Sequence, residues 1–358
     1  MSSDLHFGNL SVSIFGESHG KGIGVVIQGL PGGCEIDFEK VLDFMARRAP
    51  KKDGISTRRN EKDYPEIMSG YLNGKTTGTP LAAVIMNTDQ HSADYNNISA
   101  VARPGHADYT GYERYNGAND IRGGGHFSGR ITAPLVFAGA VCAQILEQKG
   151  ISCGAHILSI GNVWDNRFDS VNISKEFLDE IKAKDFPVID SETEFLMKQE
   201  VADASGRLDS IGGRIECAVV GMPAGVGSPM FDGIENRISQ AVFGIPAVKG
   251  IEFGRGFGFA DMCGSEANDP FTTDGKTIKT TTNNNGGILG GITNGMPIVF
   301  TAAIKPTPSI AQPQQTVDYI KMENTVLEIK GRHDACIVPR AVPVVEAAAN
   351  IALLSFLV

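Results

Sequence analysis

Hydrophobic residues near the start of the chain recur at every second position, as they do in β-strands. Over residues 9–15, Leu10, Val12 and Ile14 alternate with polar residues, which predicts a strand with one buried face. The β-branched run at 21–33, broken by glycines, predicts a second strand. Later runs of the same kind predict further strands at 79–87, 214–223, 249–254 and 296–304.

Helical spacing follows the second strand. Residues 37–49 carry apolar side chains at helical positions behind Asp37, a typical N-cap residue, and the pattern ends before Pro50. Two Ala-rich segments, 131–148 and 340–358, are apolar on nearly every face, so we expect them to form buried helices.

The order of these elements repeats along the chain, which indicates an internal duplication. A strand, a G-x-P turn and an amphipathic helix occur near the start and again at 218–239. A Gly-rich loop followed by an Ala-rich helix occurs at 123–146 and at 331–355. Chance similarity between Gly-rich turns is the alternative explanation.

The predicted fold class is α+β: an internally duplicated β-α-β sandwich whose antiparallel sheets pack on a central layer of buried helices. We expect one domain over 1–358, with repeats of about 1–150 and 205–358 joined by a more polar segment at 170–205 that carries two amphipathic helices. A doubly wound nucleotide-binding fold fits less well, because its G-x-G-x-x-G fingerprint is absent.

The predicted turn GESHG (16–20) matches the G-x-S-x-G pattern of serine hydrolases, with Ser18 as the nucleophile. Such an elbow opens into a helix and follows an oxyanion-hole loop. Here a second strand follows, and Ser18 lies too near the N-terminus for that loop to precede it. We therefore interpret GESHG as a hairpin turn that presents Glu17, Ser18 and His19, and we keep a serine hydrolase as a competing hypothesis.

The composition excludes several classes of function. The 358 residues are 42% hydrophobic and 20% charged. They contain no apolar run long enough to cross a membrane, and the N-terminal residues do not resemble a signal peptide. The net charge of −9 argues against nucleic acid as a partner. We expect a cytoplasmic protein that binds neither nucleic acid nor membrane.

The cysteines indicate neither disulfides nor a zinc site, because no C-x-x-C pair occurs. We expect all six to be buried thiols: Cys34, Cys142, Cys153, Cys217, Cys263 and Cys336.

Residues 47–59 (RRAPKKDGISTRR) are strongly basic against this acidic background, with Asp53 as the one acid among them. A solvated loop is the simpler explanation. The local excess of positive charge also suits an anionic small molecule.

Several histidines and arginines lie in loops rich in glycine or charge: His19, His106, His126, His333, Arg103, Arg122, Arg130, Arg332 and Arg340. A single loop histidine is usually structural, but four such histidines with arginines beside them indicate one assembled site. No metal-ligand spacing is present, so we expect no metal and favour acid–base chemistry on a phosphorylated ligand.

Two loops have properties that suit phosphate groups. GGGHFSGR (123–130) leads into a buried helix, whose first N–H groups lack partners and carry partial positive charge. KPTPS (305–309) places a lysine and hydroxyl groups after a predicted strand. Together with the basic stretch, these loops indicate more than one phosphate-bearing ligand.

At this level of detail the chain resembles the chorismate synthase family over essentially its whole length. Three long motifs carry the resemblance: GESHGKGIGVVIQGLPGG (16–33), GGHFSGRITAPLVFAGA (124–140) and RHDACIVPRAVPVVEAA (332–348). The segments RPGHADYT, AVKGIEFG, GGILGGI and IKPTPSI occur between them. Seven ordered segments are a specific signal, although no single one would be.

The resemblance implies a lyase of the shikimate pathway, which serves aromatic amino acid biosynthesis. The implied reaction is the anti-1,4-elimination of phosphate from 5-enolpyruvylshikimate 3-phosphate to give chorismate, which requires reduced FMN without net redox change. One phosphate would belong to FMN and one to the substrate. The arginines would bind the substrate's two carboxylates and its phosphate.

The resemblance also implies roles for individual residues. His19 would protonate or hydrogen-bond the departing phosphate, His106 would protonate the flavin near its N1–C2=O edge, and Asp334 would act with the flavin N5 to remove the ring proton. The implied substrate-binding residues are His19, Arg48, Arg103, Arg130, Arg332 and Arg340. The implied flavin-binding residues are His126, Phe127, Ser128, Pro246, Ala247, Gly290, Lys305, Pro306, Thr307, Pro308, Ser309 and Arg332.

Two positions depart from the family pattern. Members often carry a basic residue six positions after Arg48, where this chain has Gly54, and NADP contact on this loop is assigned to Arg48 alone. The flavin loop reads HFS at 126–128 where other members have RSS. The family implies a homotetramer. Because no Rossmann segment or reductase domain is recognisable, we expect an external flavin reductase.

Overall fold

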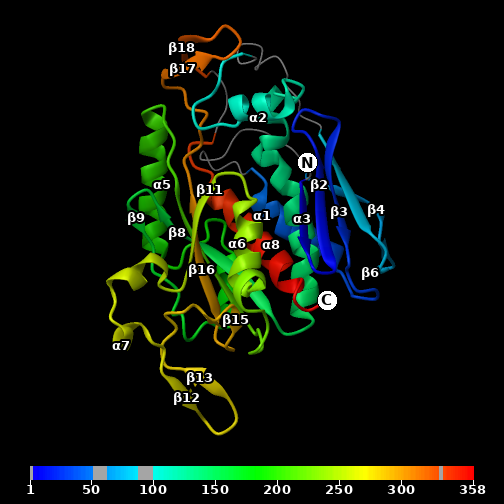
Figure 1. Ribbon diagram of the computed structural model, residues 1–358, viewed down its shortest axis with the longest axis vertical. Helices are drawn as coiled ribbons and strands as arrows, with labels where there is room; N and C mark the ends of the chain where they lie inside the picture. The colour runs from blue at the N-terminus through cyan, green and yellow to red at the C-terminus, as the bar shows by residue number, and fades with distance from the viewer. Residues whose placement is uncertain (1–2, 51–62, 88–99, 330–333) are drawn as a thin grey trace.

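In the computed structural model, which describes residues 3–50, 63–87, 100–329 and 334–358, two antiparallel sheets of five strands enclose a layer of helices (Figure 1). The first sheet consists, in spatial order, of β1 (Asp4–Phe7), β2 (Leu10–Gly16), β3 (Gly22–Gln28), β7 (Leu81–Met86) and β4 (Pro65–Ser69). The second consists of β11 (Val248–Phe253), β16 (Ile298–Ile304), β10 (Gly213–Val220), β8 (Ser152–Ile160) and β9 (Val163–Trp164).

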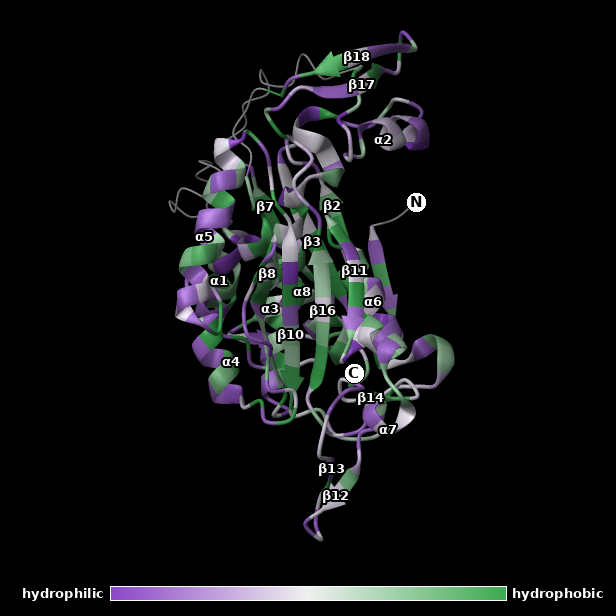
Figure 2. Ribbon diagram, turned by 90° about the vertical axis from the view of Figure 1, so that its left-hand side faces the viewer, coloured by the Kyte–Doolittle hydropathy of each residue, from purple (hydrophilic) through white to green (hydrophobic). Residues whose placement is uncertain are grey.

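The helices fall into an inner layer and an outer cover. The inner helices are α1 (Phe38–Arg48), α3 (Thr132–Glu147), α6 (Ile234–Phe243) and α8 (Val338–Leu354). α3 packs on the first sheet, α8 packs on β8 and β10 of the second, and the two helices pack on each other. Outside the second sheet, α4 (Lys175–Lys182) and α5 (Ser191–Gly206) cover β8 (Figure 2). The predicted α+β class, with antiparallel sheets on buried helices, is confirmed.

α3 and α8 approach closely because small residues line their contact. A Cβ atom on Gly139 of α3 would lie 2.2 Å from the Cβ of Ala347 in α8, so no larger residue fits there. Both helices are buried along most of their length. A helix covered on all sides needs no polar face, which explains the Ala-rich pattern of the sequence.

Shorter elements lie between the large ones along the described chain. They are α2 (Asp108–Tyr115), α7 (Gly264–Ala267), the hairpins β5–β6 (Tyr71–Leu72, Lys75–Thr76), β12–β13 (Phe271–Thr273, Ile278–Thr280), β14–β15 (Ile288–Leu289, Ile292–Thr293) and β17–β18 (Gln314–Asp318, Glu323–Leu327), and the 3₁₀ turns Arg122–Phe127, Gly129–Ile131, Met230–Asp232 and Gly256–Asp261.

The hydrophobic pattern locates most of the large elements but misses β8. All nine residues of β8 are buried, because helices cover both of its faces. Such a strand lacks the alternation on which the prediction of β2 rested. The polar segment at 170–205 does contain two helices, α4 and α5. The internal duplication and the single-domain assignment stay predictions.

Burial of the cysteines is predicted correctly at four positions: Cys142, Cys153, Cys217 and Cys336. The prediction is wrong for Cys263, which is exposed beside the short helix α7, and for Cys34, which is half-buried.

A buried histidine that the sequence analysis did not single out lies on β8. His156 is 0% exposed, and its ring nitrogens lie 3.2 Å from an Asp165 carboxylate oxygen and 3.1 Å from a Glu216 oxygen. Burial lowers the pKa of His156, but the hydrogen bonds and charges of Asp165 and Glu216 outweigh it and leave the pKa raised. Arg167 also pairs with Glu216, at 2.9 Å.

The raised pKa of His156 predicts a pH-dependent contribution to stability. A group of this kind stabilises the fold fully below its unfolded pKa of about 6.5 and loses that contribution as the pH rises through the folded value. We expect His156→Gln to lower the free energy of unfolding more at about pH 6 than at about pH 9. Denaturant unfolding at both pH values measures this difference. The control His6→Gln changes an exposed histidine of β1, and a pH-independent effect of His156→Gln would contradict the prediction.

Candidate active site

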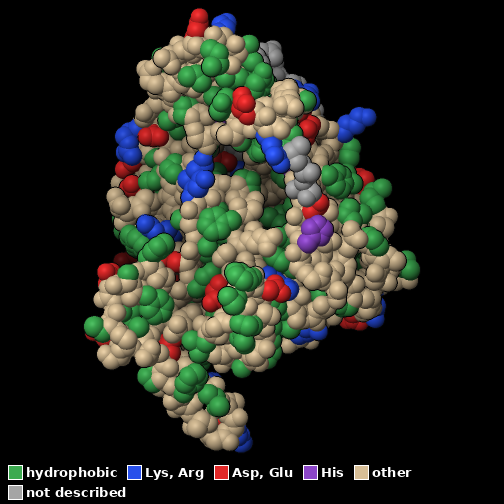
Figure 3. Space-filling view, viewed as in Figure 1, with side chains coloured by type: hydrophobic (Ala, Val, Ile, Leu, Met, Phe, Trp, Pro, Cys, Tyr) green, Lys and Arg blue, Asp and Glu red, His purple; other side chains and the backbone are tan. Residues whose placement is uncertain are grey.

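The ends of several elements meet at one end of the molecule, the upper end in Figure 1. The tip of the β2–β3 hairpin, the end of α1, the starts of α3 and α8 and the loop after β16 all lie there. Figure 3 shows this end hollowed beneath the lobe formed by α2 and β17–β18, with Lys and Arg side chains at the rim.

The tip of the β2–β3 hairpin is buried. Ser18 and His19 are 2% and 4% exposed, and the Oγ of Ser18 lies 3.2 Å from Nδ1 of His19. The same hydroxyl is within donating distance of the backbone oxygens of Arg122 and Gly123. Because strand β3 follows the turn, the strand–turn–helix elbow of a serine hydrolase is absent, and the hairpin interpretation of GESHG is correct.

A run of three glycines joins two of the predicted catalytic histidines. Gly123, Gly124 and Gly125 all have positive φ, at 60°, 86° and 52°. A Cβ on Gly123 would lie 2.0 Å from Cε1 of His19, and one on Gly124 would lie 3.1 Å from Nε2 of His106. The absence of side chains therefore lets both imidazole rings pack against one loop.

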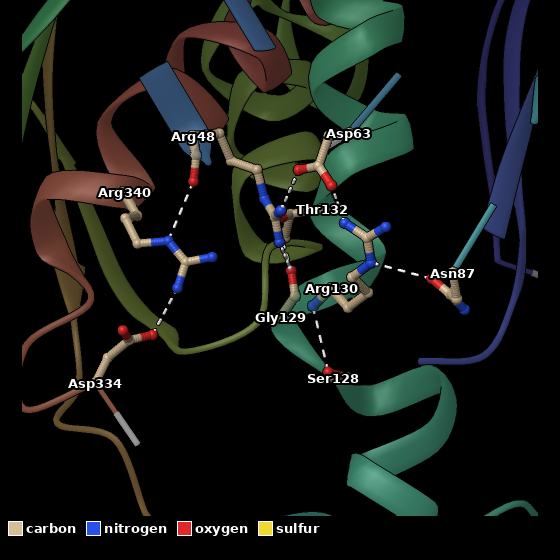
Figure 4. Close-up of polar contacts among 9 residues, drawn as sticks. All are labelled: Arg48, Asp63, Asn87, Ser128, Gly129, Arg130, Thr132, Asp334 and Arg340. Carbon is tan, nitrogen blue, oxygen red and sulfur yellow. Dashed lines mark hydrogen bonds and ion pairs between the residues drawn. The ribbon is translucent and has the colours of Figure 1, made fainter. Parts of the chain in front are cut away.

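Two of the predicted substrate-binding arginines share one carboxylate (Figure 4). The side chain of Asp63, which is 4% exposed, accepts from Nη1 of Arg48 at 2.7 Å and also pairs with Nη1 of Arg130. Arg48 additionally donates to Thr132 and to the backbone oxygen of Gly129, at 3.1 and 2.9 Å. These contacts fix a guanidinium from α1 against the start of α3.

Burial and the neighbouring charges of opposite sign oppose each other at both Arg48 and Asp63. Burial lowers the pKa of Arg48 to about 10, and the charges of Arg340 and Arg130 act in the same direction against the opposing charge of Asp63. Burial raises the pKa of Asp63, but the two guanidinium groups outweigh it and leave the value lowered. Asp63 is thus an ionised counter-charge inside a cationic cluster.

Arg340 and Asp334 extend the cluster toward α8. Nη1 of Arg340 donates to Asp334 at 2.6 Å, and its Nε donates to the backbone oxygen of Arg48 at 3.1 Å (Figure 4). Arg340 therefore links Asp334, the predicted acceptor of the ring proton, to Arg48.

The hairpin joins the same network through Asn87 at the end of β7. Its amide oxygen accepts from Nε of Arg130 at 3.1 Å, and its amide nitrogen donates to the backbone oxygens of Glu17 and Gly20. Contacts thus run from Asp334 through the arginines to the turn that carries His19.

Arg103 and His106 form a second cluster around Asp108. This carboxylate accepts from Arg103 and lies 2.7 Å from Nδ1 of His106. Nη1 of Arg103 also donates to the hydroxyl of Ser309, at 3.3 Å, in the loop after β16. The predicted flavin loop and the predicted catalytic His106 are therefore connected by one arginine.

The loop at 305–309 has features that fit a bound phosphate. The backbone N–H of Lys305 donates to the oxygen of Ala247, a non-glycine residue with φ of 74°, and its ammonium group donates to the oxygen of Gly105. Burial and the charge of Lys249 lower the pKa of Lys305. The Oγ1 of Thr307 is buried and has no hydrogen-bond partner within the described part of the chain, so a ligand oxygen would satisfy it.

The other predicted flavin-binding residues lie in different local environments. The ring of His126 contacts Ser3 and the backbone oxygen of Gly16, and Ser128 caps the turn before α3. Phe127 packs on α2, where its ring lies 2.7 Å from the position of a Cβ on Gly111. Pro246 is exposed beside Ala247.

Among the described residues, the predicted flavin residue Gly290 is not brought to this cluster. Gly290 lies in the turn of β14–β15, which precedes β16, whereas the loop at 305–309 follows it; seven residues of strand, about 20 Å, separate the two ends. Arg332 lies outside the described residues, as do His333 and the basic stretch beyond Pro50.

Sequence reasoning missed Asp63, Asp108 and Asn87. Asp63 and Asp108 are partners of predicted arginines, and Asn87 contacts both Arg130 and the hairpin turn. The sequence pattern assigned no role to any of the three. Asp108 follows His106 in RPGHADYT, and this short acid–histidine spacing is the one signal that pointed to it.

Comparisons with known proteins agree with this arrangement. A family model described as chorismate synthase matches residues 10–358. A chorismate synthase of Thermococcus kodakarensis is 46% identical over 340 residues, which cover 94% of this chain and 93% of the relative. One from Dehalococcoides mccartyi is 44% identical over 342 residues, with coverage of 96% and 93%.

A solved structure supports the same assignment: a crystal structure of chorismate synthase has a TM-score of 0.78 at 30% identity and covers 98% of this chain and 92% of its own. The chain belongs to the chorismate synthase family. Chorismate synthases are carbon–oxygen lyases of the shikimate pathway, so membership assigns 5-enolpyruvylshikimate 3-phosphate as the substrate class and a flavin as the cofactor.

Among the described residues, the helical stretch Gly129–Glu147 is long and apolar enough to cross a membrane. It contains the inner helix α3, and 83% of its most apolar window is buried inside the fold. A core helix has these properties for reasons of packing.

The shared carboxylate predicts a large effect on stability. Asp63→Ala leaves two buried guanidinium groups without their counter-charge, and we expect the free energy of unfolding to fall by about 3–5 kcal/mol. Denaturant unfolding of the ligand-free protein measures this. The control Asp179→Ala removes an exposed carboxylate that pairs with Lys175 and Lys182, and we expect a change of about 1 kcal/mol or less. Equal effects of the two substitutions would contradict the structural role of Asp63.

Proposed function

We propose that the chain eliminates phosphate from 5-enolpyruvylshikimate 3-phosphate by a 1,4-elimination that requires reduced FMN and causes no net redox change. The observation that carries the proposal is the continuous set of contacts from Asp334 through Arg340, Arg48 and Arg130 to the turn that holds His19. These contacts link basic, acidic and imidazole groups that the family resemblance assigns to the reaction, and this supports the proposal.

The substrate is a polyanion, and the proposed clamp is cationic. Arg48, Arg103, Arg130 and Arg340, together with Arg332, would bind its phosphate and two carboxylates, because guanidinium groups match these anions with paired hydrogen bonds. Burial strengthens each such interaction, since little water competes for it.

The roles proposed for the reacting side chains are those that the family resemblance implies, and the positions of these side chains support them. His19, buried at the hairpin tip, would donate a proton or a hydrogen bond to the phosphate as its bond to C3 breaks. Asp334 would take up the proton released from C6. His106 would hold a proton at the edge of the cofactor through Nε2, which faces the glycine loop.

The flavin-binding residues fit a phosphorylated cofactor. Lys305 lies close to a second lysine, and Thr307 offers a buried hydroxyl that has no hydrogen-bond partner among the described residues. The glycines at 123 and 124 let the rings of His19 and His106 pack against the loop beside the proposed site. When bound, a reduced flavin supplies electron density that eases the departure of phosphate.

Three further assignments belong to this proposal. Reduced FMN would come from an external reductase, with NADP contact confined to Arg48. The chain would work in the cytoplasm as a homotetramer, which large exposed apolar side chains such as Phe231 and Phe257 support. Gly290 would then serve the site of another copy.

Anaerobic phosphate release tests the function. With the substrate and chemically reduced FMN, we expect stoichiometric phosphate and chorismate; with NADPH and oxidised FMN alone, we expect none. Substrate binding without phosphate release would contradict the proposed reaction, and turnover on NADPH alone would contradict the external reductase.

Substitution of the reacting groups gives a second prediction. We expect His106→Ala and Asp334→Ala each to lose on the order of 100-fold or more in turnover while FMN binding persists. Phosphate release measures the turnover, and flavin fluorescence titration measures the binding. The control His6→Ala removes an exposed histidine of β1 and should leave the rate unchanged. A wild-type rate in either variant would refute its assigned role.

A further inference from the structure

Asp108, the first residue of α2, has both carboxylate oxygens occupied. Its Oδ2 accepts from the backbone N–H and the Nε of Arg103 at 2.9 and 2.7 Å. Its Oδ1 accepts from Nη2 of Arg103 at 2.7 Å and lies 2.7 Å from Nδ1 of His106. The side chain is 6% exposed, so these contacts form away from water.

We propose that Asp108 is a positioning residue that holds the proton of His106 on Nδ1 and presents Nε2 to the active site. The proposal rests on the proposed function only for the use made of Nε2; the tautomer itself depends on this chain alone. A carboxylate against one ring nitrogen fixes both the tautomer and the orientation of an imidazole.

Two groups lie close to Nδ1, and the shorter distance and the negative charge of the carboxylate favour Asp108 over Arg103. Nη2 of Arg103 lies 3.1 Å from Nδ1 and could donate only to a bare nitrogen. The Asp108 oxygen lies closer, at 2.7 Å, and accepts only from a protonated one. Burial raises the pKa of Asp108, but Arg103 and His106 outweigh it and hold the value well below its usual range, so an ionised acceptor faces Nδ1 at neutral pH.

The other side of the ring faces the glycine loop. Nε2 of His106 would lie 3.1 Å from a Cβ on Gly124, which follows the glycine that packs against His19. With Nδ1 held by Asp108, Nε2 is the nitrogen that can exchange a proton with a ligand at this loop. The same carboxylate accepts from the backbone of Arg103, so it also closes the turn before α2, and a test has to separate the two roles.

Asp108→Asn separates them because it keeps the shape and one oxygen. The three Arg103 donors compete for that single oxygen, and the amide NH₂ then faces Nδ1 as a donor, which favours the tautomer protonated on Nε2. Solid-state ¹⁵N spectra of the full-length, histidine-labelled protein at about pH 8, where ordinary imidazole is neutral, report the tautomer. Loss of a signal in His106→Gln assigns the resonance.

We expect the wild type to carry its His106 proton on Nδ1 and Asp108→Asn to carry it on Nε2, with a fall in kcat of about 100-fold. In the His106→Ala background, Asp108→Asn should lower kcat by a much smaller factor than in the wild type, because the part of its effect that acts through the ring is already absent and only its effect through Arg103 is left. Asp232→Asn is the matched control, since Asp232 also binds an arginine five positions away, Arg237, at the start of α6; its kcat should equal that of the wild type.

A wild-type ring protonated on Nε2 and bare on Nδ1 would overturn the proposal without any variant. An equal loss of kcat from Asp108→Asn in both backgrounds would also overturn it and leave a structural role. Failure of the wild type to release phosphate would refute the proposed function, whereas the tautomer measurement would keep its meaning.

Discussion

The close approach of a bare backbone to two imidazole rings is the constraint on which this site depends. A Cβ atom added to Gly123 would lie 2.0 Å from Cε1 of His19, and one added to Gly124 would lie 3.1 Å from Nε2 of His106. The positive φ values of both residues add a second reason for glycine. Without this loop the hairpin of the first sheet and the turn before α2 could not meet, and the histidines would lie in separate places.

Counter-charges make the cationic cluster compatible with folding. Buried guanidinium groups cost free energy unless they are paired, and a substrate is present only part of the time. Asp63 pairs with Arg48 and Arg130, Asp108 with Arg103, and Asp334 with Arg340. The protein therefore holds its arginines in fixed orientations before any anion arrives. Preorganised donors of this kind stabilise developing charge without reorganising at the moment of reaction.

The features that the sequence predicted correctly are those set by short segments of the chain. The hairpin at GESHG, the helix capped by Asp37 and the buried Ala-rich helices depend on spacing and turn residues, and the structure confirms them. His19 and Arg130 belong to the motifs that carry the family resemblance, and Arg48 was assigned from that resemblance. Asp63 does not belong to such a motif, and its ion pair with Arg130 joins residues 67 positions apart and depends on how β4, α1 and α3 are placed relative to one another. β8 was missed because a strand covered on both faces shows no alternation.

The most direct test of this account is the turnover of Gly123→Ala beside Gly150→Ala. Both glycines have positive φ, at 60° and 78°, but a Cβ on Gly150 meets no atom within 4 Å. Backbone strain is thus matched, and only Gly123→Ala displaces His19. We expect phosphate release to fall by roughly 100-fold in Gly123→Ala, as for a misplacement of about 1 Å, and to persist in Gly150→Ala. Equal rates in the two folded variants would contradict the claim that this loop sets the position of His19.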